Sequence, residues 1–139
     1  TIKSSVGLGI LLSEGIGDTM RVSLTADPVE EIAVAFDILS AVDVRRCKPE
    51  IVSCPTCSRC QVNLIPIADE VTRRLATINK PLKVAVMGCV VNGPGEARFA
   101  DVGVACGRDE GLLFAHGEKL RRVPADAIVD ELFALIETL

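Results

Sequence analysis

The distribution of the cysteines constrains the fold of this chain more than any other feature of its sequence. Cys54, Cys57 and Cys60 form a C-x-x-C-x-x-C run, and Cys89 follows 32 residues after Cys57, behind an apolar run over residues 82–87. The residues between these two places have the pattern of one helix followed by one strand. If both places bind one group, the chain must form a β-α-β unit, which brings the loops after two neighbouring strands together.

A sharp turn follows Cys89. The residues Asn92-Gly93-Pro94-Gly95 precede Glu96. Glycine adopts positive φ without a Cβ penalty, and proline fixes its own φ, so this run is typical of a tight turn. The turn is expected to bring the thiol of Cys89 and the carboxylate of Glu96 near one point.

Thiolates are the usual protein ligands of iron–sulfur clusters. We therefore infer that the two cysteine stretches share one cluster, and the residues leave its fourth ligand open among Cys60, Cys106 and Glu96. With Cys60 as ligand the chain would be an all-cysteine, ferredoxin-like electron carrier. A zinc-stapled binding domain and a redox disulfide also fit the cysteine pattern. The alternative for Cys47 and Cys106 is that they have no ligand role and are small buried hydrophobic residues, as free cysteines commonly are.

Composition excludes several classes of function. The chain of 139 residues is 49% hydrophobic, carries a net charge of -4, and contains no Trp or Tyr. It therefore offers neither a basic surface nor stacking aromatics for nucleic acid. No apolar run approaches the roughly 18–20 residues of a membrane span. Clustered cysteines without a signal peptide indicate a cytoplasmic location. Because the chain begins at Thr1 in a helical pattern, we expect it to be part of a longer protein.

Periodicity predicts two regions of an α+β chain. Residues 2–13 read as a helix, residues 20–24 alternate like a strand, and Asp27 and Pro28 begin a second helix, in the manner of a β/α array. The apolar residues expected to share one inward face of that helix are Val29, Ile32, Ala33, Phe36 and Leu39. After a charged linker, the second region is a β-α-β-β-β-α-like domain. Its strands are predicted at 50–52, 82–87, 101–105 and 111–114, with a possible short one at 119–122, and its helices at 67–78 and 125–139.

Three segments are more specific than these patterns. They are SEGIGDTMRVSL at residues 13–24, CPTC at 54–57, and GCVVNGPGE at 88–96. Together they resemble the family of 4-hydroxy-3-methylbut-2-enyl diphosphate synthases, in order over essentially the whole chain. The resemblance implies the C-terminal part of such a protein. Residues 1–47 would be the last β/α units of a (β/α)8 (TIM-type) barrel, and residues 48–139 a C-terminal iron–sulfur domain.

The resemblance also implies a ligand set and a reaction. The ligands of a [4Fe-4S] cluster would be Cys54, Cys57, Cys89 and Glu96, with Glu96 the weaker, catalytic ligand. The implied reaction belongs to non-mevalonate isoprenoid biosynthesis. It opens the ring of 2-C-methyl-D-erythritol 2,4-cyclodiphosphate by a two-electron reduction and removes water, giving 4-hydroxy-3-methylbut-2-enyl diphosphate. A flavodoxin or ferredoxin would donate the electrons.

Substrate contacts are implied on both regions. Arg21 and Ser23 share one side of the strand predicted at 20–24 and resemble the family's diphosphate contacts, since a guanidinium binds phosphate oxygens in a forked geometry. Asn92 resembles the family's substrate-contacting, catalytic amide. In the family the active site forms between the subunits of a homodimer. With most of the barrel missing, we expect this chain to bind a cluster but to turn over little or no substrate.

Overall fold

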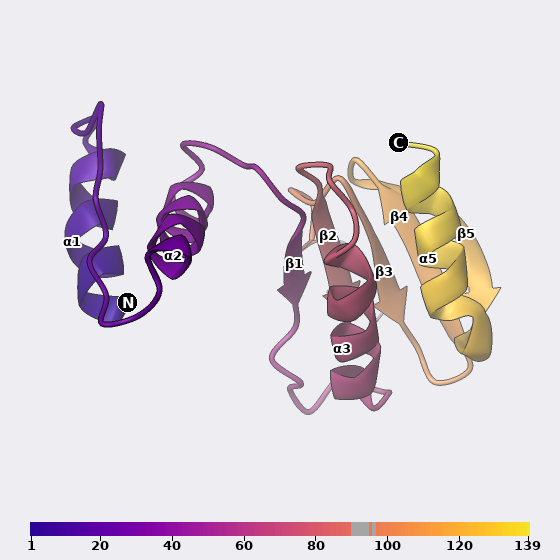
Figure 1. Ribbon diagram of the computed structural model, residues 1–139. Helices are drawn as coiled ribbons and strands as arrows, with labels where there is room; N and C mark the ends of the chain where they lie inside the picture. The colour runs from indigo at the N-terminus through magenta and orange to yellow at the C-terminus, as the bar shows by residue number, and fades with distance from the viewer. Residues whose placement is uncertain (90–94, 96) are drawn as a thin grey trace. The chain divides into compact units, whose positions relative to one another are not determined.

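The computed structural model describes residues 1–89, 95 and 97–139. The chain divides into two compact units, Thr1–Cys47 and Lys48–Leu139, which are coloured indigo to purple and purple to yellow in Figure 1.

The first unit consists of two helices, α1 (Ile2–Ser13) and α2 (Pro28–Ala41). The helix start predicted at Asp27 is confirmed, because the backbone N–H of Val29 donates a hydrogen bond of 2.9 Å to the Asp27 carboxylate. Pro28 is the first helical residue, where its missing N–H leaves no hydrogen bond unmade. The local sequence therefore sets the position at which α2 begins.

The strand predicted at residues 20–24 does not form, although its alternation is real. Val22 is buried, whereas Arg21 and Ser23 are exposed, and no strand is assigned there. A strand needs a neighbour for its backbone hydrogen bonds. The unit Thr1–Cys47, all of which the structure describes, contains no other strand to pair with it.

The inward side of α2 agrees with the prediction only in part, because Leu39 packs against the core of this unit but other residues of the predicted face do not. Ile38 is buried against Leu12 and Val22, while Val29 and Ile32 are 75% and 60% exposed. Because α2 has apolar residues on more than one side, periodicity could not choose between them. The structure selects the side that faces α1.

The second unit is a five-stranded sheet with two helices and a short 3-10 turn. The elements are β1 (Glu50–Ser53), α3 (Leu64–Leu75), β2 (Lys83–Met87), β3 (Val102–Cys106), β4 (Glu110–Ala115), β5 (Glu118–Pro124), η1 (Ala125–Ala127) and α5 (Ile128–Glu137). Every strand and helix predicted for this region is present within a few residues. The possible strand at 119–122 is a full strand, which adds one strand to the predicted order.

The strands lie in the order β1-β2-β3-β4-β5. The pairs β1–β2 and β2–β3 are parallel, and β3–β4 and β4–β5 are antiparallel. A tight turn joins β4 to β5 through His116 and Gly117, both with positive φ. This pairing explains why β5 is long, since a hairpin partner extends a strand beyond what its own residues indicate.

Each face of the sheet has its own core. Helices α3 and α5 cover one face, as Figure 1 shows, and pack on alternate residues of the strands. On the other face Phe114 lies fully buried over Gly103, packed with Ala97 and Ala100. A side chain on Gly103 would meet the Phe114 ring and the carbonyl oxygen of Ala85, the latter at 2.6 Å. Both faces of the central strands are thus buried, as is typical of parallel strands.

Candidate metal centre

Three cysteines lie where parallel strands end. Cys54 directly follows β1, Cys89 lies two residues after β2, and Cys106 is the last residue of β3. Because β1, β2 and β3 are parallel neighbours, their carboxyl ends share one edge of the sheet. The prediction that the loops after two neighbouring strands meet is therefore confirmed for the loops that carry Cys54 and Cys89.

Hydrogen bonds attach the loop of Cys54, Cys57 and Cys60 to β2 and to the residue after it. At its start the Cys54 N–H donates to the Val86 carbonyl at 3.2 Å, and at its end the Gln61 N–H donates to the Gly88 carbonyl at 3.0 Å. Between them the Cys60 N–H donates to the Cys57 carbonyl at 2.9 Å and closes a turn. The loop is thus held at both ends against the strand that leads to Cys89.

The sulfurs of Cys54 and Cys60 both lie close to Gly88. A methyl group built on Gly88 would overlap Cys60 Sγ and would lie 3.4 Å from Cys54 Sγ. Both sulfurs therefore lie beside Gly88, next to Cys89 in the chain. Sequence reasoning gave no role to Gly88, although a glycine next to a predicted ligand was a usable signal.

The environments of the six cysteines differ. Cys54 and Cys60 are partly buried, Cys57 is exposed, and Cys89 and Cys106 are buried. Burial, together with the neighbouring thiols Cys60 and Cys54, raises the pKa of the Cys106 thiol to about 12. Cys106 is therefore a protonated, core-forming residue in this structure, as its hydrophobic reading predicted.

Cys47 does not fit the prediction of a small buried residue. It is exposed, at the end of the first unit. The polar and charged residues around it already indicated a linker, and a cysteine there has no core to enter. The prediction of burial was wrong for Cys47 because it used the residue type without its surroundings.

The donor set at this edge suits a soft metal or a cluster, since thiolates of two loops joined by hydrogen bonds belong to it. Within the described residues, no three Cys, His, Asp or Glu side chains converge in a metal-binding arrangement. Asn92 and Glu96 lie outside the described residues. The ligand set Cys54, Cys57, Cys89 and Glu96 therefore stays a prediction, as does the role of Asn92.

Arg21 and Ser23 are exposed on the first unit, on the opposite side of their segment from buried Val22. The alternation that motivated their assignment is confirmed. Their side chains are thus accessible to a ligand, and their role as diphosphate contacts stays a prediction.

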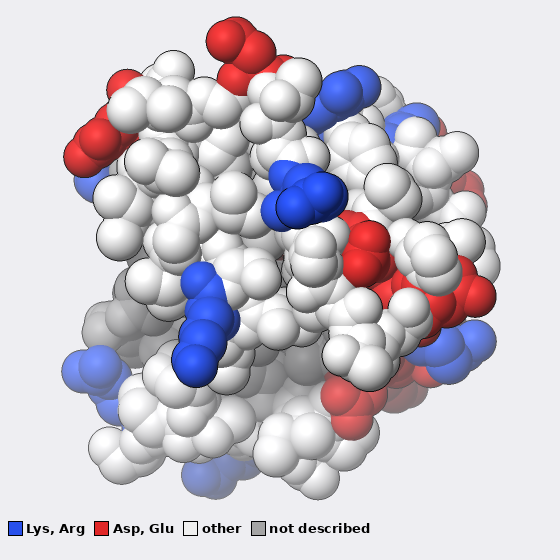
Figure 2. Space-filling view, turned by 60° about the vertical axis from the view of Figure 1, so that its left-hand side comes forward, with Lys and Arg blue, Asp and Glu red and all other residues white. Residues whose placement is uncertain are grey.

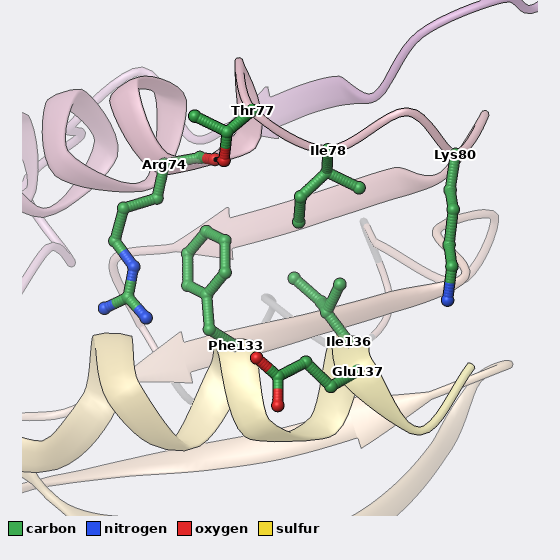
Figure 3. A pocket seen from close by; sticks show the side chains of 7 residues that line it. All are labelled: Arg74, Thr77, Ile78, Lys80, Phe133, Ile136 and Glu137. Atoms are coloured by element: carbon green, nitrogen blue, oxygen red, sulfur yellow. Dashed lines mark hydrogen bonds between the residues drawn. The ribbon is translucent and has the colours of Figure 1, made fainter.

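The hollow shown in Figure 3 is a different place from the cysteine edge. It has a volume of about 310 Å³ and lies between the end of α3 and α5. The Arg74 guanidinium lies 4.0 Å from the centre of the Phe133 ring and donates to Asp130 at 2.7 Å. Since α3 starts on the cysteine side and runs back toward the start of β2, this hollow lies near the opposite edge of the sheet. The contacts of Arg74 with Phe133 and Asp130 join α3 to α5 beside this hollow.

The charged surface matches the composition. On the face shown in Figure 2, Lys and Arg side chains are interspersed with Asp and Glu, and large areas are uncharged. The described residues on this face form no extended basic surface of the kind that nucleic acid requires. None of the described helices has the length and apolar character needed to cross a membrane.

Comparison with known proteins gives a family match in each of the two units. The family model described as GcpE protein C-terminal domain matches residues 50–138, and that described as GcpE TIM-barrel domain matches residues 1–36. Relatives of this chain carry the name 4-hydroxy-3-methylbut-2-en-1-yl diphosphate synthase (flavodoxin), among them proteins from three organisms. The protein of Geobacter sulfurreducens is 64% identical over 99% of this chain, that of Clostridium acetobutylicum 57% over 100%, and that of Corynebacterium jeikeium 61% over 95%.

The chain spans 39%, 40% and 34% of the lengths of these three relatives. The segments that motivated the resemblance lie within the matched residues. Because the C-terminal model covers more than half of the chain and the relatives match nearly all of it, the chain belongs to the GcpE family.

Proposed function

We propose that this chain is the C-terminal part of a 4-hydroxy-3-methylbut-2-enyl diphosphate synthase. In this proposal residues 48–139 form its [4Fe-4S] domain and residues 1–47 the terminal portion of its barrel. The observation that carries the proposal is the placement of Cys54 and Cys89 at the carboxyl ends of neighbouring parallel strands. Membership of the GcpE family supports the same reading.

The proposed reaction is the reductive opening of a cyclic diphosphate with loss of water. It consumes two electrons and converts 2-C-methyl-D-erythritol 2,4-cyclodiphosphate to 4-hydroxy-3-methylbut-2-enyl diphosphate, within non-mevalonate isoprenoid biosynthesis. When bound, a [4Fe-4S] cluster supplies single electrons in succession and a Lewis-acidic iron. The relatives' printed names include flavodoxin, which supports a flavodoxin-type donor, with a ferredoxin as the alternative.

The chain's own residues have distinct roles in this proposal. Cys54, Cys57 and Cys89 hold the cluster as soft thiolate ligands, and Glu96 is the fourth ligand through a harder carboxylate oxygen. Asn92 contacts the substrate through its side-chain amide. On the first unit Arg21 binds the diphosphate in a forked geometry, and Ser23 donates its hydroxyl.

The complete enzyme is proposed to be a cytoplasmic homodimer, in which the cluster domain of one subunit completes the barrel site of the other. The present chain contains only part of the barrel portion of its relatives. We therefore expect it to bind the cluster but to open little or no substrate ring when given a reductant.

The first test is the iron and acid-labile sulfide content per chain after anaerobic reconstitution. We expect about four irons and four sulfides. Zinc in place of iron would overturn the proposal and favour a zinc-stapled domain. No metal in a folded chain would also overturn it. Because the chain has no Trp or Tyr, protein concentration should be measured by amino-acid analysis.

An electron carrier with Cys60 as fourth ligand is the second candidate, because Cys60 Sγ lies beside Gly88 near Cys54. The substitutions Glu96→Ala and Cys60→Ser separate the two candidates. In the proposed enzyme Cys60→Ser keeps four irons, whereas Glu96→Ala weakens the binding of one. The opposite result would favour the carrier.

A further inference from the structure

We propose that Cys60 and Gly88 form a lock that positions the two ligand-bearing loops against each other, and that Cys60 is a positioning residue without bonding to iron. The inference rests on the proposed function, because it takes Cys54, Cys57 and Cys89 as the thiolate ligands. It gives a role to Cys60 and Gly88, which are not part of the proposed ligand set.

The first contact of the lock is steric. Cys60 Sγ occupies the space in which a side chain of residue 88 would lie, and Cys60 Cβ is 3.3 Å from the same point. Gly88 is buried, and the sulfur of the partly buried Cys60 lies directly against it. Only glycine at position 88 leaves room for this sulfur, because any Cβ would overlap it.

The second contact is made by the backbone. The Gln61 N–H donates to the Gly88 carbonyl at 3.0 Å, so Gly88 is held on both sides by the end of the cysteine loop. Its neighbour Cys89 is a proposed ligand. A shift of the loop at Cys60 would therefore change how far the thiols of Cys54 and Cys57 lie from the thiol of Cys89.

The third contact engages the Cys60 thiol itself, which is why we do not assign it as an iron ligand. Its Sγ donates a hydrogen bond of 3.3 Å to the Val62 carbonyl, and it packs on the core between the sheet and the helices α3 and α5. Cys106 lies behind it as a fully buried neighbour. A sulfur held by a carbonyl and by the core fixes the path of the chain from the cysteine loop into α3.

The lock is tested by iron retention. After anaerobic reconstitution, the rate at which an iron(II) chelator removes iron should rise about tenfold in Cys60→Ala. It should stay within twofold of the original in Cys60→Ser, because a serine hydroxyl can also donate to the Val62 carbonyl. Cys47→Ser is the matched control, since Cys47 is exposed in the other unit. Loss of one iron per chain in Cys60→Ser would overturn the proposal, because it would identify Cys60 as a ligand.

Mutual rescue tests the steric contact without any iron. Gly88→Ala should lower the unfolding temperature of the cluster-free chain and should expose Cys54 to faster alkylation. Adding Cys60→Ala to Gly88→Ala removes the overlapping sulfur and should restore at least half of both losses. Additive losses in the double variant would overturn the lock.

The two measurements separate this inference from the proposed function. If the unmodified chain takes up no iron, the proposed function fails, and the rescue experiment still decides whether the contact exists. If the chain takes up four irons and Cys60→Ala retains them as well as the original, the proposed function stands and the lock is wrong.

Discussion

The two units differ in how completely each buries its own apolar residues. In the first unit Leu12, Val22 and Ile38 are the buried hydrophobic residues, and large side chains such as Ile2 and Val29 are 80% and 75% exposed. In the second unit buried residues fill both faces of the sheet. The second unit therefore has a core that can stabilise it by itself, whereas the first retains apolar surface that its own residues do not cover.

This contrast bears on the candidate metal centre. The loop of Cys54, Cys57 and Cys60 is attached to the well-packed second unit, so hydrogen bonds to Val86 and Gly88 set the positions of both its ends. The proposed diphosphate contacts Arg21 and Ser23 are exposed on the first unit, which has only a small core.

The largest effect concerns two cysteine thiols. In the cluster-free chain at pH 8, we expect iodoacetamide to alkylate exposed Cys47 at least about a thousandfold faster than Cys106, which reacts only when the core opens. The pKa of the Cys106 thiol, raised to about 12 by burial, acts in the same direction because less thiolate is present. Mass spectrometry of the two peptides measures both rates. Similar rates would show that the second unit opens readily.

In the second unit, Phe114→Ala should lower the free energy of unfolding by about 3–5 kcal/mol, because it empties the space over Gly103. Urea unfolding followed by circular dichroism measures the change. The matched control is Phe99→Ala, at a ring that is 73% exposed, which should change stability by less than about 0.5 kcal/mol. Equal effects would contradict the core assignment.

In the first unit, Ile38→Ala should cost about 2 kcal/mol, near the lower end for a buried isoleucine, because only Leu12 and Val22 are buried with it and the surrounding residues are partly buried. Hydrogen exchange of the α2 amides localises this loss. Exchange in β2 and β3 should be unchanged if the units unfold separately. Ile32→Ala, at an exposed position of the same helix, serves as the control.

The smallest effect is at the start of α2. Asp27→Ala removes the acceptor for the Val29 N–H and should destabilise the helix by about 1 kcal/mol. Asp27→Asn keeps an acceptor oxygen and should retain most of the stability. Hydrogen exchange of residues 29–31 measures the change, and an effect of Asp27→Asn as large as that of Asp27→Ala would point to charge instead of capping.

Much of the second unit could be predicted from its sequence because its signals are local. The apolar run at 82–87 specifies a buried strand, and the spacing between Cys57 and Cys89 leaves room for one helix. The strand β5 was underestimated, since its length depends on pairing with β4. The predicted strand at 20–24 failed for the related reason that alternation does not supply a partner strand.

The sequence by itself determined which residues can carry the chemistry and where helices and strands begin, because residue type, spacing and capping are local properties. The tertiary structure decided the surroundings of each cysteine. Cys47, Cys60 and Cys106 are alike in type, yet one is exposed, one packs against Gly88, and one is buried in the core. Those differences arise from the side-by-side placement of strands distant in the chain, which no local pattern encodes.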